Sequence, residues 1–159
     1  ILAFTCDEIW LAMPHREGDD VRNVVLNEMN KPFAEYALGE AEMAKWDRII
    51  AVRTAVNGAL ENARNEKKIG KALEATVALT VPAADAFLAE MDMNELADLL
   101  IVSQVSVTVG DALAVTVEAA QGEKCQRCWK VLTAVGTVAE HSDLCPRCAA
   151  VVKAMNIAE

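Results

Sequence analysis

The sequence lacks an apolar run long enough to cross a membrane, because charged or small polar residues interrupt every apolar stretch well before roughly 18 positions. It also lacks the basic, apolar and small-residue succession that marks a signal peptide at the start of a chain. From these two absences we expect a cytoplasmic protein with no membrane segment. The 159 residues, 53% of them apolar, suffice for one ordinary domain or for a main domain with a small appendage.

The short motifs of common catalytic and nucleotide-binding sites are also missing, since no G-x-S-x-G, H-E-x-x-H or G-x-G-x-x-G occurs. The stretch KKIGKA, residues 67–72, resembles a phosphate-binding loop only in Gly70 and Lys71, because Ala72 replaces the Ser or Thr of that motif. Carboxylates are abundant, but nothing in the sequence brings two of them together as a catalytic pair. We therefore expect no catalytic residue in this chain.

Basic side chains are absent from residues 72–123, which carry nine acidic ones, and the whole chain has a net charge of −9. Such a charge argues against broad binding of nucleic acid. Two segments are nevertheless net basic, residues 43–71 by four charges and residues 124–159 by two. A basic patch can attract a polyanion even on an acidic protein, although an ordinary solvated helix face explains the charge pattern equally well.

The chain does not begin with methionine, and ILAFTCDEIWLAM opens inside an amphipathic pattern, so we expect an excised C-terminal part of a longer protein. Thr5, with a glutamate three residues later, predicts a capping box at the start of a short helix that ends before Pro14. Cys6 then reads as a small residue on that helix. Residues 14–42 have the turn residues and weak periodicity of a loop-rich segment, and His15 has no evident partner there.

Hydrophobic periodicity predicts one long helix from Met43 to about Lys67, before the helix stop signal Gly70. Its apolar residues form one broad stripe, which consists of Trp46, Ile49, Ile50, Val52, Val56, Ala59, Leu60 and Ala63. Beyond Gly70 the period falls to two, which is typical of a strand that is buried on one face. The alternating apolar positions of this strand, which ends at Pro82, are Ala75, Val77, Leu79 and Val81.

The rest of the predicted sheet follows a segment, residues 83–98, in which we expect one or two short helices. LIVSQVSVTV and ALAVTVEA alternate as two further strands, and Gly110 with Asp111 predicts a hairpin turn between them. The order of these elements is that of a β-α-β-β unit. QGEK, residues 121–124, then reads as a polar hinge into the cysteine-rich tail.

Four of the five cysteines form two Cys-x2-Cys pairs, sixteen residues apart: Cys125, Cys128, Cys145 and Cys148. This spacing is typical of a four-thiolate zinc site, in which each tight turn points two sulfurs at one ion. The closed ligand set leaves no position for water or substrate, so we expect one structural Zn²⁺, with iron as an alternative metal. Disulfides are a further alternative that a reducing compartment disfavours. His141 could replace a cysteine, although the complete cysteine set favours a loop histidine.

Three cations and one tryptophan lie in or beside the cysteine pairs: Arg127, Trp129, Lys130 and Arg147. Single-stranded nucleic acid needs positive charge for its phosphates and a flat face for its bases, and these residues supply both. An equally good interpretation packs Trp129 over the zinc site as part of a tiny core. The tail is too short to bury much surface, so we expect its folding to depend on the metal.

Four stretches resemble the C-terminal region of bacterial isoleucyl-tRNA synthetases, which are class I aminoacyl-tRNA synthetases. ILAFTCDEIW is similar to a helix of the family's anticodon-binding domain, and WDRIIAVRTAVNGALENAR with KKIGKALEATVAL is similar to its long helix and the following turn. LLIVSQVSV comes next, and GEKCQRCWKVLTAVGTVAEHSDLCPRC resembles the family's zinc-binding tail. Met29 departs from the pattern, because the family often has tryptophan at its place.

The resemblance implies that the chain binds isoleucine tRNA through the anticodon arm, with the aromatic residue after the second cysteine against an anticodon base. It also implies that ATP is used only in an upstream catalytic part, and that the other partner is the rest of a monomeric parent synthetase. The residues that we expect to bind RNA are Arg53, Arg64, Lys67, Lys68, Lys71, Arg127, Trp129, Lys130 and Arg147.

We therefore expect an α+β fold in three parts. Residues 1–72 form the end of a helical domain of the anticodon-binding type, residues 73–120 a small β-α-β-β unit, and residues 121–159 a four-cysteine zinc finger. Two other functions fit the tail: the nucleic-acid-binding finger of a DNA-repair glycosylase of the formamidopyrimidine type, and a purely structural, zinc-stapled interaction domain.

Overall fold

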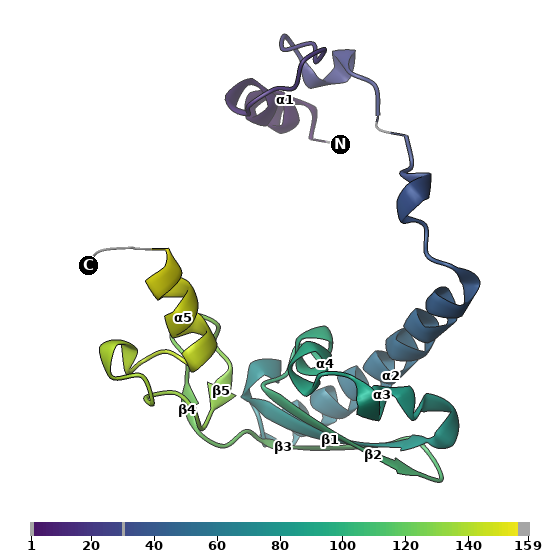
Figure 1. The fold of residues 1–159 in the computed structure, drawn as a ribbon, viewed down its shortest axis with the longest axis vertical. Helices are drawn as coiled ribbons and strands as arrows, with labels where there is room; N and C mark the ends of the chain where they lie inside the picture. The colour runs from purple at the N-terminus through teal and green to yellow at the C-terminus, as the bar shows by residue number, and fades with distance from the viewer. Residues whose placement is uncertain (1, 30, 156–159) are drawn as a thin grey trace. The chain divides into compact units, whose positions relative to one another are not determined.

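The computed structural model describes residues 2–29 and 31–155 and divides the chain into two compact units, Ile1–Gly39 and Glu40–Glu159 (Figure 1). Residue 72, the predicted end of the first domain, falls inside the second unit. Among the described residues, no helix has both the length and the apolar character needed to cross a membrane.

The first unit contains the helix α1 (Ala3–Ala12) and two 3-10 turns, η1 (Val24–Leu26) and η2 (Ala34–Tyr36). The helix ends before Pro14 as predicted, but Thr5 lies inside its first turn, and no side chain caps its start at Leu2. The predicted capping box is therefore wrong. Every described residue of this unit is at least partly exposed, including Cys6 on α1.

Asp20 organises the loop after α1. Its carbonyl oxygen accepts a 3.1 Å hydrogen bond from the Trp10 indole nitrogen, and its backbone N–H donates to the Asn27 side chain at 2.8 Å. Two hydrogen bonds from the Arg22 guanidinium hold the pKa of Asp20 down, at about 2. His15, for which the sequence showed no partner, packs its ring 4.6 Å from that of Trp10.

The long helix α2 (Glu40–Asn65) opens the second unit, three residues before the predicted start. Its buried residues are Ile49, Val52, Val56, Leu60 and Ala63, which confirms most of the predicted stripe. Trp46 and Ile50 are exceptions, with 41% and 56% of their surfaces exposed. Trp46 precedes the first buried residue, and Ile50 lies about 100° around the helix from its buried neighbour Ile49.

The end of α2 is set by Lys67 and not by Gly70, so the predicted stop signal is wrong. Lys67 has a φ of 59°, and its N–H donates to the Arg64 carbonyl oxygen at 3.0 Å. The Lys68 N–H donates to the Ala63 carbonyl oxygen at 2.9 Å, which completes the closing pattern of a Schellman motif. Gly70 instead donates its N–H to the Glu74 carboxylate at 2.9 Å.

The sheet contains β1 (Ala75–Pro82), β2 (Gln104–Gly110) and β3 (Ala114–Ala119) in the order β2-β1-β3. β2 is parallel to β1, and β3 is antiparallel to it. The predicted hairpin between β2 and β3 is therefore wrong, because β1 lies between them. Gly110 stands opposite Pro82 at the end of β1, where the chain crosses to the far edge.

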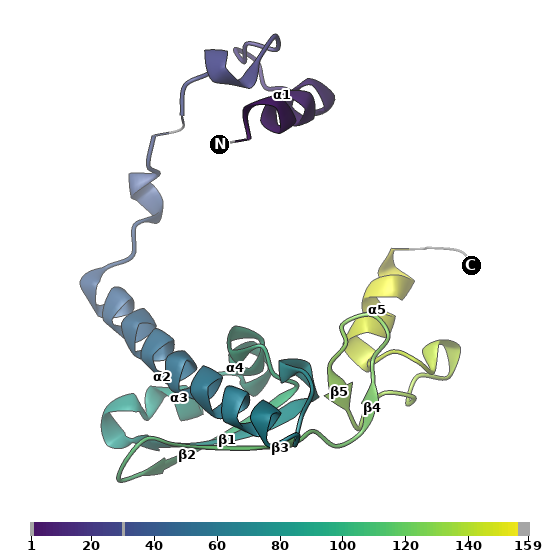
Figure 2. The ribbon, with the colours of Figure 1, turned by 180° about the vertical axis from the view of Figure 1, so that it is seen from behind.

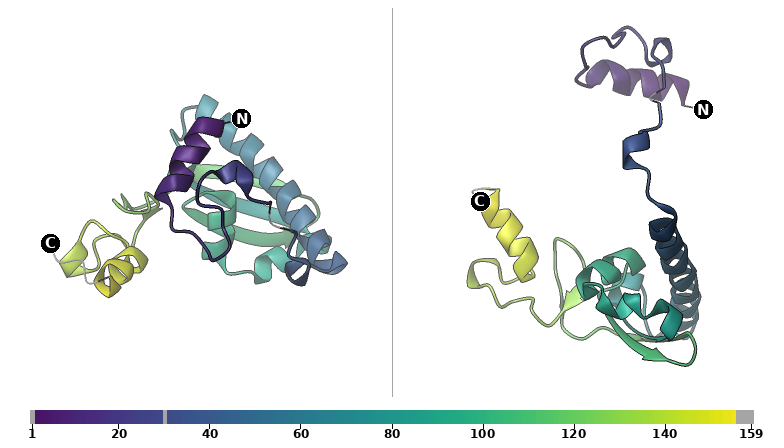
Figure 3. Two further views of the ribbon diagram at one scale, coloured as in Figure 1. Left: turned by 90° about the horizontal axis from the view of Figure 1, so that it is seen from above. Right: turned by 45° about the vertical axis from the view of Figure 1, so that its right-hand side comes forward.

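Two short helices, α3 (Phe87–Glu90) and α4 (Met93–Leu100), form the crossover between the parallel strands, as the sequence predicted. α2 lies over β3 and α4 over β2, and both cover the same face of the sheet (Figure 3). That face carries the alternating buried residues of β1, so the hydrophobic core lies between the sheet and these helices. The Arg48 guanidinium on α2 donates two hydrogen bonds, of 2.8 and 2.6 Å, to the carboxylate of the buried Asp85 and so joins α2 to the turn after β1.

The cysteine-rich tail, residues 121–155, is called the finger below. It contains the short antiparallel strands β4 (Glu123–Lys124) and β5 (Val131–Leu132), the 3-10 turn η5 (Ala139–His141) and the helix α5 (Pro146–Ala154). Figure 2 shows the finger at one end of the sheet. The predicted hinge, residues 121–124, is partly strand, because Glu123 and Lys124 form β4. Gly122 is required there for two reasons: its φ is 116°, and a Cβ at this position would lie 2.3 Å from the Leu132 carbonyl carbon.

Candidate metal centre and nucleic-acid interface

Cys125, Cys128, Cys145 and Cys148 converge in the finger, with all four sulfur atoms within 4.8 Å of one another. The sulfurs of Cys128 and Cys145 are 3.9 Å apart. A tetrahedral Zn²⁺ with Zn–S bonds of about 2.3 Å places its ligands about 3.8 Å from one another, so this cluster fits zinc. His141 is on η5 and is not part of the cluster. The four thiolates would hold the ion as a closed, structural site.

Backbone hydrogen bonds shape both turns that carry the cysteines. In the first turn, the Trp129 N–H donates to the Cys125 carbonyl oxygen at 2.9 Å, and the Cys125 N–H donates to the Lys130 carbonyl oxygen at 2.9 Å. In the second turn, Cys145 precedes α5, and its N–H donates to the Cys125 sulfur at 3.3 Å. Cys125, Cys145 and Cys148 are buried together with Leu144 and Ala149 in a small core of the finger's own, and the half-buried Cys128 packs against it.

The protein environment separates the pKa values of these thiols. Burial opposes ionisation of Cys125, but backbone N–H groups around its sulfur outweigh that effect and lower its pKa to about 6. Burial raises the pKa of Cys128 to about 12 and also raises that of Cys145. Zinc binding must therefore displace protons from these two thiols.

Two of the four arginines predicted to bind RNA, Arg127 and Arg147, lie beside the cysteine cluster. Arg127 donates from its guanidinium to the Cys148 sulfur at 3.9 Å, so it belongs to the surroundings of the metal site. The negative charge of the Cys148 thiolate raises the pKa of Arg147. Both arginines are exposed, and their positive charges offset part of the double negative charge of a zinc ion with four thiolates.

Lys130, which the sequence predicted to bind RNA, is mostly buried. Only 13% of its side chain is exposed, and its ammonium group forms a 2.6 Å ion pair with Asp98 on α4. Lys130 therefore fastens the finger to α4. The sequence did not reveal this contact, because the two residues belong to different elements that are far apart along the chain.

Trp129, in contrast, projects into solvent with 60% of its surface exposed. It is absent from the finger's core cluster, and its backbone has a left-handed φ of 66°. The Lys124 ammonium group lies 5.8 Å from the centre of its ring. The two residues line a cavity of about 240 Å³, which is called the Trp129 cavity and is also lined by Lys71, Ala72, Leu73, Glu74 and Ile101.

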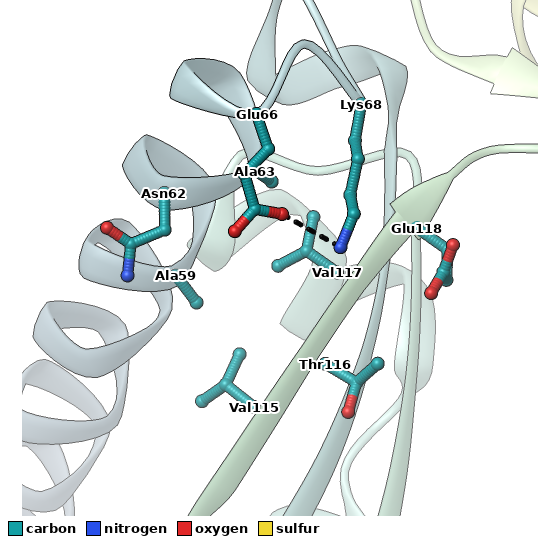
Figure 4. A pocket seen from close by; sticks show the side chains of 9 residues that line it. All are labelled: Ala59, Asn62, Ala63, Glu66, Lys68, Val115, Thr116, Val117 and Glu118. Atoms are coloured by element: carbon teal, nitrogen blue, oxygen red, sulfur yellow. Dashed lines mark ion pairs between the residues drawn. The ribbon is translucent and has the colours of Figure 1, made fainter.

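The basic residues predicted around α2 are all exposed, but they do not converge on one site. Lys71 lines the Trp129 cavity. Arg64 pairs with Glu61, and Lys68 pairs with Glu66 at 2.9 Å. Figure 4 shows this second pair at a separate groove between α2 and β3. Arg53 and Lys67 have no ion-pair partner among the described residues.

Lys124 and Ile101 are among the residues of the Trp129 cavity that were missed in the sequence. Lys124 directly precedes the first cysteine, so its closeness to the predicted zinc turn was a usable signal. Ile101 carried no signal, because apolar periodicity places it in a strand and reveals neither its backbone conformation nor its exposure.

Comparison with known proteins relates the finger to a zinc-finger family and nearly the whole chain to isoleucine--tRNA ligases. Residues 122–151 match the family model described as a zinc finger found in FPG and IleRS. An isoleucine--tRNA ligase from Syntrophotalea carbinolica is 42% identical over 163 residues, which are 96% of this chain and 17% of that protein. The chain is similar to isoleucine--tRNA ligases along nearly its whole length.

Other relatives of the same name give the same result. The protein from Geobacillus kaustophilus is 43% identical over 166 residues, which are 96% of this chain and 18% of that protein. The protein from Dichelobacter nodosus is 40% identical over 148 residues, which are 93% of this chain and 16% of that protein. The chain thus spans about a sixth of the length of these curated relatives.

Proposed function

We propose that this chain is a tRNA-binding part of an isoleucine--tRNA ligase, and that its finger binds an unpaired nucleotide of the anticodon arm. Similarity to isoleucine--tRNA ligases over 96% of the chain supports the parent enzyme. The matched zinc-finger model and the geometry of the four cysteines support a structural zinc ion in the finger. The binding role itself is argued from the surface around Trp129.

The observation that carries this proposal is the conformation of Trp129. A left-handed backbone costs an L-residue roughly 1 to 2 kcal/mol, and glycine would avoid this cost. Burial does not compensate for the strain, because the ring is 60% exposed. Strained residues that keep a large exposed side chain are typical of binding sites. An indole ring on a turn fixed by zinc offers a rigid stacking surface for a base, which lowers the entropy cost of binding.

The charge around this ring suits RNA. Lys124 and Lys71 stand at the same cavity. Further proposed contacts lie outside this cavity: Arg53 and Lys67, which are exposed, and Arg64 and Lys68, which are exposed but pair with Glu61 and Glu66. Arg127 and Arg147 add charge at the finger. Lys130 is left out of the proposed surface, because Asp98 neutralises it. Phosphates would bind these side chains while the base stacks on the indole.

The alternatives draw on the same finger but explain less of the chain. The family model covers fingers of both FPG and IleRS, so on its own it also fits a DNA-repair glycosylase. The similarity to isoleucine--tRNA ligases continues far outside the finger, over residues that this alternative does not explain. A purely structural finger would not need an exposed tryptophan in a strained backbone.

The parent enzyme in this proposal is a cytoplasmic monomer that activates isoleucine with ATP in parts outside this chain. Within the chain, residues 1–72 belong to the anticodon-binding domain, residues 73–120 form the small α+β unit, and residues 121–159 form the zinc-binding tail that includes the finger. No catalytic step is assigned to these residues.

A binding titration tests the proposal. The zinc-loaded chain is titrated with isoleucine tRNA, with a non-cognate tRNA and with duplex DNA at several salt concentrations, and Trp129 quenching is followed by fluorescence. We expect binding of isoleucine tRNA, in preference to both competitors, to quench the indole. Trp10 and Trp46 are replaced by phenylalanine in the chain used for fluorescence, so that the signal reports on Trp129. Replacing Lys71 with alanine should reduce the salt slope by about one unit, as expected for one phosphate contact. Stronger binding of duplex DNA would favour the glycosylase alternative, and no binding of any nucleic acid would favour a structural finger.

A further inference from the structure

Three described residues other than glycine have a positive φ: Lys67 at 59°, Ile101 at 58° and Trp129 at 66°. Two of them, Ile101 and Trp129, line the same cavity although one comes from the end of α4 and the other from the finger. Strained backbone tends to cluster where a protein binds its ligands. The coincidence of two such residues at one cavity therefore singles out Ile101.

Ile101 closes α4 in a position that favours glycine. Its N–H donates to the Asp98 carbonyl oxygen at 3.1 Å, and the following Val102 N–H donates to the Ala97 carbonyl oxygen at 2.9 Å. This is the closing pattern of a Schellman motif, whose left-handed residue is usually glycine. Isoleucine is among the least suitable residues there, because its β-branch crowds the backbone.

Burial does not explain why isoleucine occupies this position, because 50% of its surface is exposed. Helix closure does not need the side chain either, since both hydrogen bonds involve only backbone atoms. What the side chain does provide is an apolar surface at the Trp129 cavity, where Ala72 and Leu73 add further apolar lining.

The charged groups of the cavity indicate what it binds. Lys71 and Lys124 face one carboxylate, that of Glu74, which already accepts the N–H groups of Gly70 and Lys71 at 2.9 and 3.1 Å. The cavity thus combines apolar and aromatic surface with a net positive charge. A nucleotide, with a flat base and a phosphate, matches both features, whereas an apolar side chain of a protein partner would leave the lysines unused.

We propose that Ile101 is a recognition residue that contacts the same unpaired nucleobase that stacks on Trp129, with the adjoining phosphate near Lys71 and Lys124. This inference rests on the proposed tRNA-binding function. It assigns a role in RNA binding to the sheet unit, so the binding site is built jointly by the finger and the end of α4.

The test compares Ile101→Gly with Trp129→Gly, both of which relieve backbone strain while removing a side chain. Ile101→Gly should keep its zinc and thermal stability and should bind isoleucine tRNA about tenfold more weakly, as expected for a lost aliphatic contact. Ile101→Asn, a residue that tolerates left-handed backbone, is a second variant in case glycine frays α4. Val109→Ala is the matched control, because Val109 is similarly exposed, at 54%, but lies on β2 outside the cavity. This control should bind as wild type does.

The outcomes separate this inference from the proposed function. If Trp129→Gly weakens tRNA binding and both Ile101 variants bind as wild type does, the role of Ile101 is overturned and the proposed function stands. If the wild-type chain binds no tRNA, the proposed function fails, and the cavity is then tested alone with nucleoside monophosphates. Shifts of the Ile101 methyl and Trp129 indole NMR signals on adding these monophosphates would support a nucleotide cavity, and unchanged signals would overturn it.

Discussion

The Ser103 hydroxyl accepts a 2.7 Å hydrogen bond from the Val131 N–H, and so joins the residue before β2 to β5 of the finger. The same hydroxyl donates to the Leu73 carbonyl oxygen at 2.6 Å. Ser103 is 4% exposed, so water cannot readily replace either partner. With the Lys130–Asp98 pair, this hydroxyl fixes the finger beside residues 71–74 and thereby sets the two sides of the Trp129 cavity.

Replacing Ser103 with alanine should loosen this junction. The Val131 N–H and the Leu73 carbonyl oxygen would both lose a buried partner, at a cost of about 1 to 3 kcal/mol. Amide hydrogen exchange at Val131 measures the loss directly, because that N–H should exchange faster in the variant. Ser106→Ala is the control, since Ser106 is an exposed serine of β2. Unchanged protection of Val131 in Ser103→Ala would show that other contacts hold the junction.

Removal of zinc should unfold the finger alone. The finger and the helix-covered sheet have separate hydrophobic clusters, and the metal ligands belong to the cluster of the finger. Metal analysis should return about one zinc per chain. Cys145→Ser or strong chelation should move the finger's amide NMR signals into the narrow chemical-shift range of an unfolded chain. Signals of α2 and β1 should stay in place. Finger signals that survive complete removal of the metal would contradict a metal-dependent fold.

Zinc affinity should fall steeply as the pH falls. In the metal-free chain, burial holds the pKa of Cys128 at about 12 and also raises that of Cys145, so both thiols are protonated near neutral pH. Zinc binding then releases at least these two protons. The logarithm of the association constant should drop by at least about two when the pH drops from about 8 to about 7. Competition with a chelator of known affinity measures it, and a constant that does not vary with pH would exclude the proposed thiol ligands.

The Arg48–Asp85 pair should stabilise the second unit at neutral pH. Hydrogen bonds from Arg48 lower the pKa of the buried Asp85 against the opposing effect of burial, so the stabilisation is present above the unfolded value of about 3.9 and is lost as the pH falls through the folded value. Arg48→Met should reduce the free energy of unfolding in urea at pH 7, because it leaves the buried Asp85 carboxylate without its partner, but by less than for a pair in which both groups are buried. Arg53→Met, an exposed change on the same helix, should cost little. Equal losses in the two variants would show that the pair is not stabilising.

Features that depend on neighbouring residues could be predicted from the sequence. The spacing of the cysteines predicted the cluster, and alternation along residues 75–82 predicted β1 with the correct buried face. The same alternation identified β2 and β3 as strands but placed them in a hairpin, because periodicity shows which face is buried and not which strands are neighbours. The pairing is decided by two connections: the crossover through α3 and α4 places β2 parallel to β1, and the chain after Gly110 passes to the other edge of β1, where β3 pairs with it.

Features that depend on distant residues or on unusual backbone could not be predicted. Lys130 read as a free cation because its partner Asp98 belongs to α4, and the hydroxyl of Ser103 read as one position in an alternating strand. The end of α2 was predicted near Lys67, but the left-handed backbone of Lys67 and Ile101 was not, because glycine, the usual signal for such a residue, is absent from both positions. These departures from local rules lie beside the proposed binding surface, where such departures are expected.

The most direct test of RNA binding by the finger is the affinity of Trp129→Gly for isoleucine tRNA, measured together with its zinc content. Glycine suits the left-handed turn, so the variant should keep about one zinc and should be at least as stable as wild type. Loss of base stacking, worth about 1 to 3 kcal/mol, should weaken binding by about 5- to 150-fold. A variant that keeps its zinc and binds isoleucine tRNA as tightly as wild type would contradict the account.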